Sequence, residues 1–413
     1  MISVTHPTGN ANVRAVLAAL EQADELESFY TTVGVDESAW YIHLLPQSIK
    51  KELLRRTYNL PKSKTSTRPL RELVRLGASK FNFNFLTAHG TGWASVDSVY
   101  RDLDRYVANQ LIVNCQNCKV EAVYCYEDAA IHTFRAAKQL GIKCFYDLPI
   151  GYWQMGKIIQ QEEAELIPEW ASTLTANFDS PEKCVRKDEE LQLADVVFVA
   201  SSFTLQTLKM SPRLHAPIVV IPYGTPPVTD LGQNNARGKL RVLFVGSLGQ
   251  RKGLSYLLDA IKQLGNQVEL TLIGRPTGSC HPLEQALRRH RWIASLPHQQ
   301  ILEEMRRHDV LVLPSLFEGF GLVILEAMSQ GIPVIATPHT AGPDVITDGE
   351  DGFIVPIRSA EAISEKLELL LCDRRLLLAM SQAAQRKSAQ YSWESYGRNI
   401  VNTIKTYIEA TSR

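Results

Sequence analysis

The chain has 413 residues, 45% of them apolar, and 44 basic residues balance 44 acidic residues to a formal net charge of zero. A chain of this length can bury more than one core and should divide into two or three domains, while a balanced charge gives no global field to recruit nucleic acid or a membrane. No apolar run approaches the roughly 18 residues of a membrane-spanning helix, and the start, Met1 to Thr5, has no charged leader. Seven scattered cysteines favour reduced thiols. We therefore expect a cytoplasmic location and no nucleic-acid partner.

Apolar strand-like runs alternate with helical stretches in two successive blocks. The first block predicts strands at Ile2–Thr5, Phe29–Val33, Ala122–Tyr126, Ile142–Asp147, Val196–Ala200 and Ile218–Ile221. The second predicts strands at Leu240–Val245, Val268–Ile273, Trp292–Ala294, Asp309–Leu313, Pro333–Ala336 and Phe353–Val355. This alternation is typical of an α/β protein with mainly parallel sheets, so we expect two doubly wound Rossmann-like domains. The turn-rich segment from Pro222 to Asn235 is the expected linker.

Two loops in the first block follow predicted strands. After the first strand, a Thr-Gly-Asn turn precedes a helical stretch, and Gly9 and Asn10 there could contact an anion or a sugar. Equally, Asn10 or Asn12 could simply cap the helix, and the sequence leaves both interpretations open. Farther along, Asp147 ends a predicted strand and leads into Gly151-Tyr-Trp153, which could shape an acceptor pocket or belong to the core.

Residues 47–80 contain ten basic residues against two acidic ones, with leucines between them at helical spacing. A basic amphipathic stretch can lie on anionic lipid. The alternative is a solvated face of an insertion that its leucines hold against the domain. Peripheral membrane contact through 47–80 is thus one of two open hypotheses.

Two motifs suggest metals only superficially. Asp102-Leu-Asp104 has the Asp-x-Asp spacing of a metal site but lies in a helical pattern, which indicates a solvated helix face. Cys115-Gln-Asn-Cys118 has metal-ligand spacing, yet no second pair follows it. We therefore predict no metal site.

The second block offers a phosphate-binding loop directly after its first strand. Gly246-Ser-Leu-Gly-Gln-Arg-Lys-Gly253 places two adjacent cations just before a helix. A diphosphate needs cations that persist at neutral pH, and Arg251 and Lys252 meet that need. An exposed basic turn is the simpler alternative for this loop taken alone.

Glu318-Gly-Phe-Gly-Leu-Val-Ile-Leu-Glu326 is the most informative motif, because two carboxylates flank a strand-to-helix turn. The N–H groups of a helix start are unpaired and carry partial positive charge, so the residues Gly319, Phe320, Gly321 and Leu322 form a good phosphate seat. Glu326, inside the helix, could accept from the hydroxyls of a ribose, and Glu318 could reach a sugar beyond the phosphates. Both glutamates could instead be solvated helix-start charges.

From about Leu240 onward these motifs resemble the retaining nucleotide-sugar glycosyltransferases of GT-B fold, the glycogen synthase-like group 1 or family 4 kind. Gly331-Ile-Pro-Val334 and Tyr391-Ser-Trp-Glu394 add to the resemblance, which is much weaker over the first half. It implies an N-terminal acceptor-side domain at 1–222, a C-terminal nucleotide-sugar donor domain at 223–392, and a final helix, 393–413, that crosses back onto the N-terminal domain.

The resemblance also implies a metal-independent hexosyltransferase. It would move a sugar from a nucleoside diphosphate donor to a hydroxyl acceptor, a glycan or a lipid, with retention of configuration and no permanently bound cofactor. Lys252 falls on the family's usual lysine, while Ser247 replaces an arginine often found there. Asp147 stands where the family often has a histidine, which implies a role near the reacting sugar for Asp147 beside Glu318. A phosphorylase, a nucleotide-sugar epimerase or a non-catalytic relative on the same fold remain alternatives.

Overall fold

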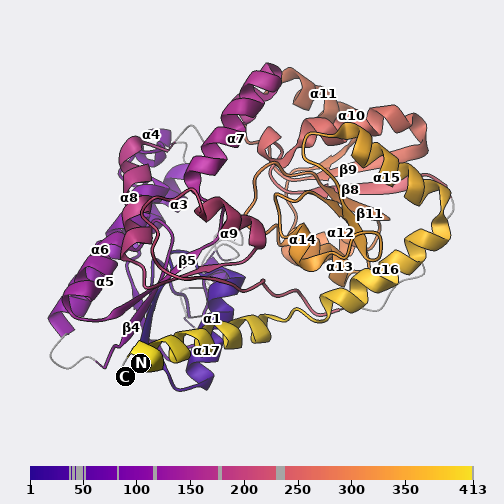
Figure 1. Cartoon of the computed structure of the whole chain (residues 1–413). Helices are drawn as coiled ribbons and strands as arrows, with labels where there is room; N and C mark the ends of the chain where they lie inside the picture. The colour runs from indigo at the N-terminus through magenta and orange to yellow at the C-terminus, as the bar shows by residue number, and fades with distance from the viewer. Residues whose placement is uncertain are drawn as a thin grey trace.

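The structure, a computed structural model, describes residues 1–36, 39, 42, 50, 53–80, 83–114, 119–174, 179–228 and 238–411. It contains two parallel β-sheets with helices packed on their faces (Figure 1). The first sheet has the order β3-β2-β1-β4-β5-β6-β7, built from β1 (Ile2–Thr5), β2 (Leu26–Thr31), β3 (Thr65–Thr67), β4 (Ala122–Tyr126), β5 (Lys143–Leu148), β6 (Val196–Val199) and β7 (Ile218–Val220). The second has the order β10-β9-β8-β11-β12-β13, built from β8 (Leu240–Val245), β9 (Val268–Ile273), β10 (Arg291–Ile293), β11 (Val310–Leu313), β12 (Val334–Ala336) and β13 (Gly352–Ile354).

Helices connect consecutive parallel strands, as parallel pairing requires. We call the part of the chain that forms the first sheet the first half, and the part that forms the second sheet the second half. The helices of the first half are α1 (Ala11–Gln22), α3 (Leu70–Lys80), α4 (Asn84–Thr87), α5 (Val96–Asn114), α6 (Ile131–Gln139), α7 (Trp153–Leu166), α8 (Pro181–Leu193) and α9 (Ser202–Leu208). Those of the second half are α10 (Leu254–Leu264), α11 (His281–Arg289), α12 (His298–Met305), α13 (Val323–Ser329), α14 (Gly342–Val345), α15 (Ala360–Cys372), α16 (Arg374–Ser388) and α17 (Trp393–Thr411). Within the described residues, no helix combines the length and apolar character needed to cross a bilayer.

The predicted fold class is confirmed, and all twelve predicted strands are present with ends shifted by up to three residues. The strand order reverses between β1 and β4 in the first sheet and between β8 and β11 in the second. Ligands of doubly wound sheets bind beyond the carboxyl ends of the strands at such a reversal. In the second half, the two loops at that point are the ones that follow β8 and β11, and these carry the predicted donor residues.

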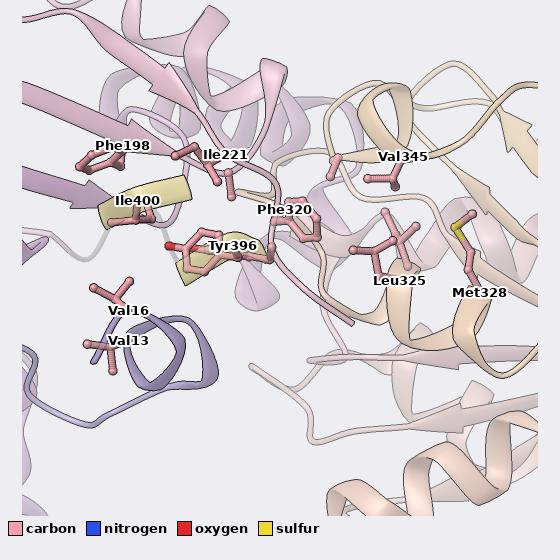
Figure 2. Packing of buried hydrophobic residues seen from close by; sticks show 14 of the residues in the cluster. Val13, Val16, Phe198, Ile221, Phe320, Leu325, Met328, Val345, Tyr396 and Ile400 are labelled. Atoms are coloured by element: carbon pink, nitrogen blue, oxygen red, sulfur yellow. The ribbon is translucent and has the colours of Figure 1, made fainter. Parts of the chain in front are cut away.

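The final helix returns to the first half, as predicted. Figure 1 shows α17 lying beside α1, and the two helices approach so closely that a Cβ on Gly397 would be 2.2 Å from the Ala15 carbonyl oxygen. One apolar cluster runs from α1 through α17 into the second half. In Figure 2, Phe320 lies between Tyr396 of α17 and Leu325 of α13. The two halves therefore share part of their core.

A second connection runs through α7 and the 3-10 helix η3 (Pro168–Thr173). Figure 1 shows α7 rising from the first sheet toward α10 and α11. Trp170 of η3 is 2% exposed and packs in the apolar core of the second half, among residues such as Leu254 and Leu283. The domain boundary between 222 and 223 stays a prediction, and residues 229–235 of the predicted linker lie outside the described part of the chain.

Candidate active site

The loop after β8 is held in a tight turn that presents its two cations side by side. Residues Gln250–Lys252 form a short 3-10 helix, and Gly253 ends it with φ of 67°. A Cβ on Gly253 would lie 2.0 Å from the carbonyl oxygen of Pro314, in the loop after β11. Glycine is therefore needed both for the left-handed backbone and for the close approach of the two loops.

The loop after β11 brings Glu318 against these cations. The Lys252 ammonium forms an ion pair with the Glu318 carboxylate, and the Arg251 guanidinium lies 3.4 Å from the same oxygen. Arg251 also donates to the Phe317 carbonyl oxygen over 2.7 Å. The structure thus joins three residues that the sequence analysis singled out in two separate loops.

Burial shapes the charge state of this group. It lowers the pKa of Arg251, and burial together with the neighbouring guanidinium lowers the pKa of Lys252 well below its ordinary value. Contact with the Glu318 carboxylate acts in the other direction, because an adjacent negative charge favours the ammonium form. A bound diphosphate would favour that form in the same way, so the site is suited to an anionic ligand.

In the predicted phosphate-binding turn between Glu318 and Glu326, the backbone is available to a ligand while part of the side chains belongs to the core. Gly321 has φ of 81° and turns the chain into α13, whose first N–H groups have no partner within the helix. Phe320 is 2% exposed and its ring lies 5.0 Å from that of Tyr223, so only its backbone can face a ligand. Leu322 is partly exposed at 38%.

Glu326 lies in α13, where its side chain is mostly buried and contacts a histidine. Its Oε1 is 2.8 Å from His298 Nε2, and this hydrogen bond raises the pKa of His298. His298 begins α12 and was not predicted, because a lone histidine at a helix start carries no sequence signal. A ribose bound by Glu326 would share that carboxylate with His298 or displace it.

In the first half, Gly9 and Asn10 lie in the loop after β1. Gly9 has φ of 66°, and its N–H donates to His6 Nδ1 over 2.9 Å. Asn10 is the residue before α1, but its side chain makes no capping hydrogen bond. Asn10 therefore occupies the N-cap position without a side-chain capping bond, and Asn12 lies inside the helix, where its amide donates to Asp147.

A pocket of about 750 Å³ lies beside this loop, lined in part by Arg14 and Tyr58. Arg14 donates to the Gly9 carbonyl oxygen over 3.0 Å, and a Cβ on Gly9 would overlap Tyr58. Three threonines, Thr57, Thr65 and Thr67, also line the pocket. Hydroxyl groups at such a wall suit a polyhydroxylated ligand.

Asp147 ends up in the interior of the first half. It is 2% exposed, and its carboxylate accepts from the Asn12 amide over 3.1 Å. Burial raises its pKa to about 7, with the Asn12 and Tyr124 side chains opposing that shift. Contact between Asp147 and a reacting sugar stays a prediction, which requires that the sugar reach this buried carboxyl.

The loop that follows Asp147 does touch the donor turn. A Cβ on Gly319 would lie 1.8 Å from the Pro149 carbonyl oxygen, so this glycine lets the two halves meet backbone to backbone. The Gly319 carbonyl oxygen accepts from the hydroxyls of Ser201 and Thr204 in the first half. Those two residues were not predicted, since hydroxyl side chains at a helix start read as ordinary caps.

Tyr152 and Trp153 belong to the core alternative rather than to an acceptor pocket. Tyr152 is 2% exposed, and its hydroxyl donates to Asp188 over 2.8 Å. The Trp153 indole donates to the same carboxylate oxygen over 2.8 Å. Both side chains therefore anchor the start of α7 to α8.

The superficial metal motifs have structural roles or lie outside the described residues. Asp104 is 1% exposed and accepts from the backbone N–H groups of His132 and Thr133, so the expected solvated helix face is wrong for this residue. Asp102 pairs with Arg68 at 3.1 Å. Residues Cys115–Cys118 lie outside the described part of the chain. Among the described residues, no group of three or more His, Cys, Asp or Glu side chains could hold a metal ion.

The basic stretch is only partly a surface feature. Arg56 is 6% exposed and pairs with the buried Glu72 at 2.8 Å, because the insertion folds back on α3. Arg55 is exposed, whereas residues 47–49, 51 and 52 lie outside the described residues. A different feature stands out just beyond the stretch, where Phe83, Phe85 and Trp93 are 52%, 71% and 45% exposed.

Comparison with known proteins finds similarity to glycosyltransferases. Residues 230–387 match the family model described as "Glycosyl transferases group 1". A D-inositol 3-phosphate glycosyltransferase from Corynebacterium urealyticum is 29% identical over 202 residues, which cover 44% of this chain and 48% of that protein. A sucrose synthase from Melioribacter roseus is 35% identical over 127 residues, 28% of this chain and 16% of that protein. The match thus spans about half the length of the first relative and much less of the second.

Solved structures extend the likeness to the whole chain. Sucrose-phosphate synthase from Thermosynechococcus elongatus superimposes with a TM-score of 0.65 at 18% identity, covering 99% of both chains. Anabaena HepE in complex with UDP-glucose does so with a TM-score of 0.62 at 16% identity, covering 98% of this chain and 99% of that one. These similarities show the fold. The whole chain thus has the GT-B fold of these neighbours, and its residues 230–387 are similar to the group 1 glycosyltransferases.

Proposed function

We propose that the protein transfers a hexosyl group from a nucleoside diphosphate sugar to a hydroxyl acceptor, with retention of anomeric configuration and without a metal ion. The convergence of Arg251, Lys252 and Glu318 carries the proposal. These residues come from the two loops at the strand-order reversal of the second sheet, which is where a doubly wound domain binds nucleotides. HepE, a protein of the same fold, has been solved with UDP-glucose.

In this proposal, each residue has a distinct task. Arg251 and Lys252 bind the diphosphate and stabilise the charge that develops as it leaves, the task a metal performs in other transferases. The backbone from Gly319 to Leu322 donates to the phosphates. Glu326 accepts from the ribose hydroxyls, and Glu318 orients the donor sugar once the diphosphate takes over its contacts with the two cations.

Retention rests on the family resemblance. The acceptor hydroxyl attacks from the face that the diphosphate leaves, its proton passes to the leaving phosphate oxygen, and no strong protein base is then required. Asp147 would act near the sugar from the acceptor side. The hydroxyl-lined pocket beside Gly9 is the proposed region for a glycan or lipid-linked acceptor.

A cytoplasmic location with peripheral contact to the inner membrane face is the companion proposal. Three exposed aromatic residues, Phe83, Phe85 and Trp93, lie close in sequence to the arginines of α3. The guanidinium carbon of Arg71 lies 4.6 Å from the centre of the Trp93 ring. Exposed aromatic side chains beside arginines suit the interface of an anionic bilayer.

A donor panel tests the enzymatic proposal. UDP-, GDP- and ADP-sugars are incubated with the protein, and release of free nucleoside diphosphate and sugar is followed with and without excess EDTA. We expect slow hydrolysis of one donor class that survives EDTA, with the released sugar initially in the donor's anomeric configuration by NMR. Inversion would contradict retention, and loss of activity restored by magnesium or manganese would contradict metal independence. Binding of a donor without any turnover would favour the alternative of a non-catalytic relative.

A further inference from the structure

A fully buried carboxylate in the first half is held entirely by side chains from the second half. Glu163 of α7 is 0% exposed. Its Oε1 accepts from Gln250 Nε2 over 2.7 Å and from the Tyr256 hydroxyl over 2.8 Å, and its Oε2 accepts from Arg358 Nε over 2.8 Å. A buried charge is costly unless it is paired and hydrogen-bonded, so this arrangement depends on all three partners.

One of these partners leads directly into the phosphate loop. Gln250 is the residue before Arg251 and Lys252, and it is fully buried. Its backbone N–H donates to Thr173 Oγ1 over 2.9 Å, and its side-chain oxygen accepts from the Ser255 N–H over 3.1 Å. The turn that carries the two cations is therefore fixed from behind by residues of α7 and η3.

The N-terminal end of α7 contacts the other turn of the site, the one that carries Glu318. A Cβ on Gly156 would lie 2.8 Å from the Phe317 ring, and one on Gly151, just before α7, would lie 2.7 Å from it. Phe317 precedes Glu318, and its carbonyl oxygen accepts from Arg251. One helix thus touches both the turn that carries the cations and the turn that carries Glu318.

The third partner shows backbone strain at the same place. Arg358 has φ of 61°, a left-handed conformation that is uncommon for residues other than glycine. From this backbone it reaches both Glu163 and the neighbouring Glu162, at 2.8 Å and 3.1 Å. Strain of this kind persists only where surrounding contacts over-determine the position.

We propose that α7 is a brace that sets the spacing of the two donor-phosphate turns, with Glu163 as its positioning residue. Glu163 touches no substrate. It acts through Gln250 to hold Arg251 and Lys252 at the distance from Glu318 that a diphosphate requires. The inference rests on the proposed function, because it assigns the phosphate to this pair of turns, and it adds a residue outside the matched family segment.

The test compares Glu163→Gln with Glu162→Gln, a matched control. Glu162 is next in the chain, carries the same charge, contacts the same arginine, and has a side chain that is 54% exposed. Binding of UDP, GDP and ADP to each protein is measured by calorimetry. For whichever nucleotide binds the unmodified chain, we expect the dissociation constant to rise about tenfold in Glu163→Gln, the effect of one lost charge-assisted contact, and to stay unchanged in Glu162→Gln.

Amide hydrogen exchange separates positioning from general destabilisation. In Glu163→Gln we expect faster exchange at residues 250–256, whose N–H groups include those of Gln250 and Ser255, with little change in the strands of either sheet. If Glu163→Gln fails to fold, Gln250→Ala removes the link to the loop while leaving Glu163 its contacts with Tyr256 and Arg358.

The outcomes distinguish the two proposals. If the unmodified chain binds none of the three nucleotides, the proposed function itself fails. If it binds one of them and the folded variant, Glu163→Gln or in its place Gln250→Ala, binds it equally well, the brace is refuted while the proposed function stands. Uniformly faster exchange across the chain also refutes the brace, because Glu163 would then be a structural residue only.

Discussion

Replacing Asp147 by asparagine should stabilise the protein, and increasingly so as the pH rises. The carboxyl is fully buried, and its pKa is raised from 3.8 to about 7. Asparagine has nearly the same shape, keeps an oxygen to accept from the Asn12 amide, and never ionises. The variant therefore removes the cost of ionising a buried acid while leaving the local packing in place.

The sign and size follow from the two pKa values. Because the folded-state pKa lies above the unfolded-state value, the protonated carboxyl favours the folded state at acid pH, and this contribution is lost as the pH rises from 3.8 through about 7. With each pKa unit worth about 1.4 kcal/mol, the ionisation cost is about 2 kcal/mol at pH 5 and about 4 kcal/mol at pH 8. The advantage of the variant should thus grow by roughly 2 to 3 kcal/mol between these two pH values.

Urea unfolding at pH 5, 6, 7 and 8, for both proteins in the same buffers, measures this difference. Other buried acids also have a raised pKa, and Glu190, at about 8, is one of them. They titrate in both proteins, so they cancel in the difference between the two unfolding free energies. A difference that is the same at all four pH values would refute the reasoning and show that Asp147 is neutral, or equally ionised, in both states.

The same variant also tests the role that the family resemblance implies for Asp147. Once a donor is known, loss of turnover at unchanged nucleotide affinity in a stabilised, folded variant would show that the carboxyl acts in the chemistry. Turnover equal to that of the unmodified chain would make Asp147 a structural acid of the first half.

Three other predictions address the donor site and the surface. Lys252→Ala should weaken nucleoside diphosphate binding about tenfold to a hundredfold, and Arg251→Ala should weaken it less, as expected for loss of a charge-assisted hydrogen bond. If calorimetry finds unchanged affinity in both variants, this loop does not bind the diphosphate. Glu326→Gln should weaken binding of a nucleoside diphosphate without a matching fall in melting temperature. The control Glu303→Gln, on the exposed face of α12, should change neither the affinity nor the melting temperature. A large fall in melting temperature at unchanged affinity would show that Glu326 has a structural role only. Phe83→Ser with Phe85→Ser should reduce sedimentation with anionic vesicles at low salt, whereas Leu378→Ser, at a residue of the second half that is 51% exposed, should not. Absence of vesicle binding by the unmodified chain would contradict membrane contact through 47–80 and through these aromatic residues.

Most strands of the two sheets could be predicted because they are buried on both faces. Such strands appear as continuous apolar runs, and runs of that kind stand out between helical stretches. The exception is β3, whose residues Thr65, Ser66 and Thr67 are polar and lie at the edge of the first sheet. An edge strand of three small polar residues carries no apolar signal, so the sequence could not reveal it.

The two turns that carry Arg251, Lys252 and Glu318 could also be predicted, since glycines and charges cluster where a strand ends. What the sequence could not show is which side of a strand end a polar residue faces. Asp147 and Glu318 look alike in this respect, yet the first is enclosed with Asn12 and Tyr124 while the second meets Lys252 in the loop beside it. That difference depends on packing between elements far apart in the chain.

Glu163 shows the same limit most sharply. It lies in Gln160-Gln-Glu-Glu163, a run that suggests a solvated helix face, and the neighbouring Glu162 does have an exposed side chain. Only the docking of α7 against the second half decides that one of two adjacent glutamates becomes buried and the other stays in water. The residues that tie the two halves together were therefore invisible to local pattern, because their partners, Gln250, Tyr256 and Arg358, lie 87 to 195 positions away. The arrangement of a site between the two halves is set by such long-range contacts, so its loops could be predicted from the sequence, but its geometry could not.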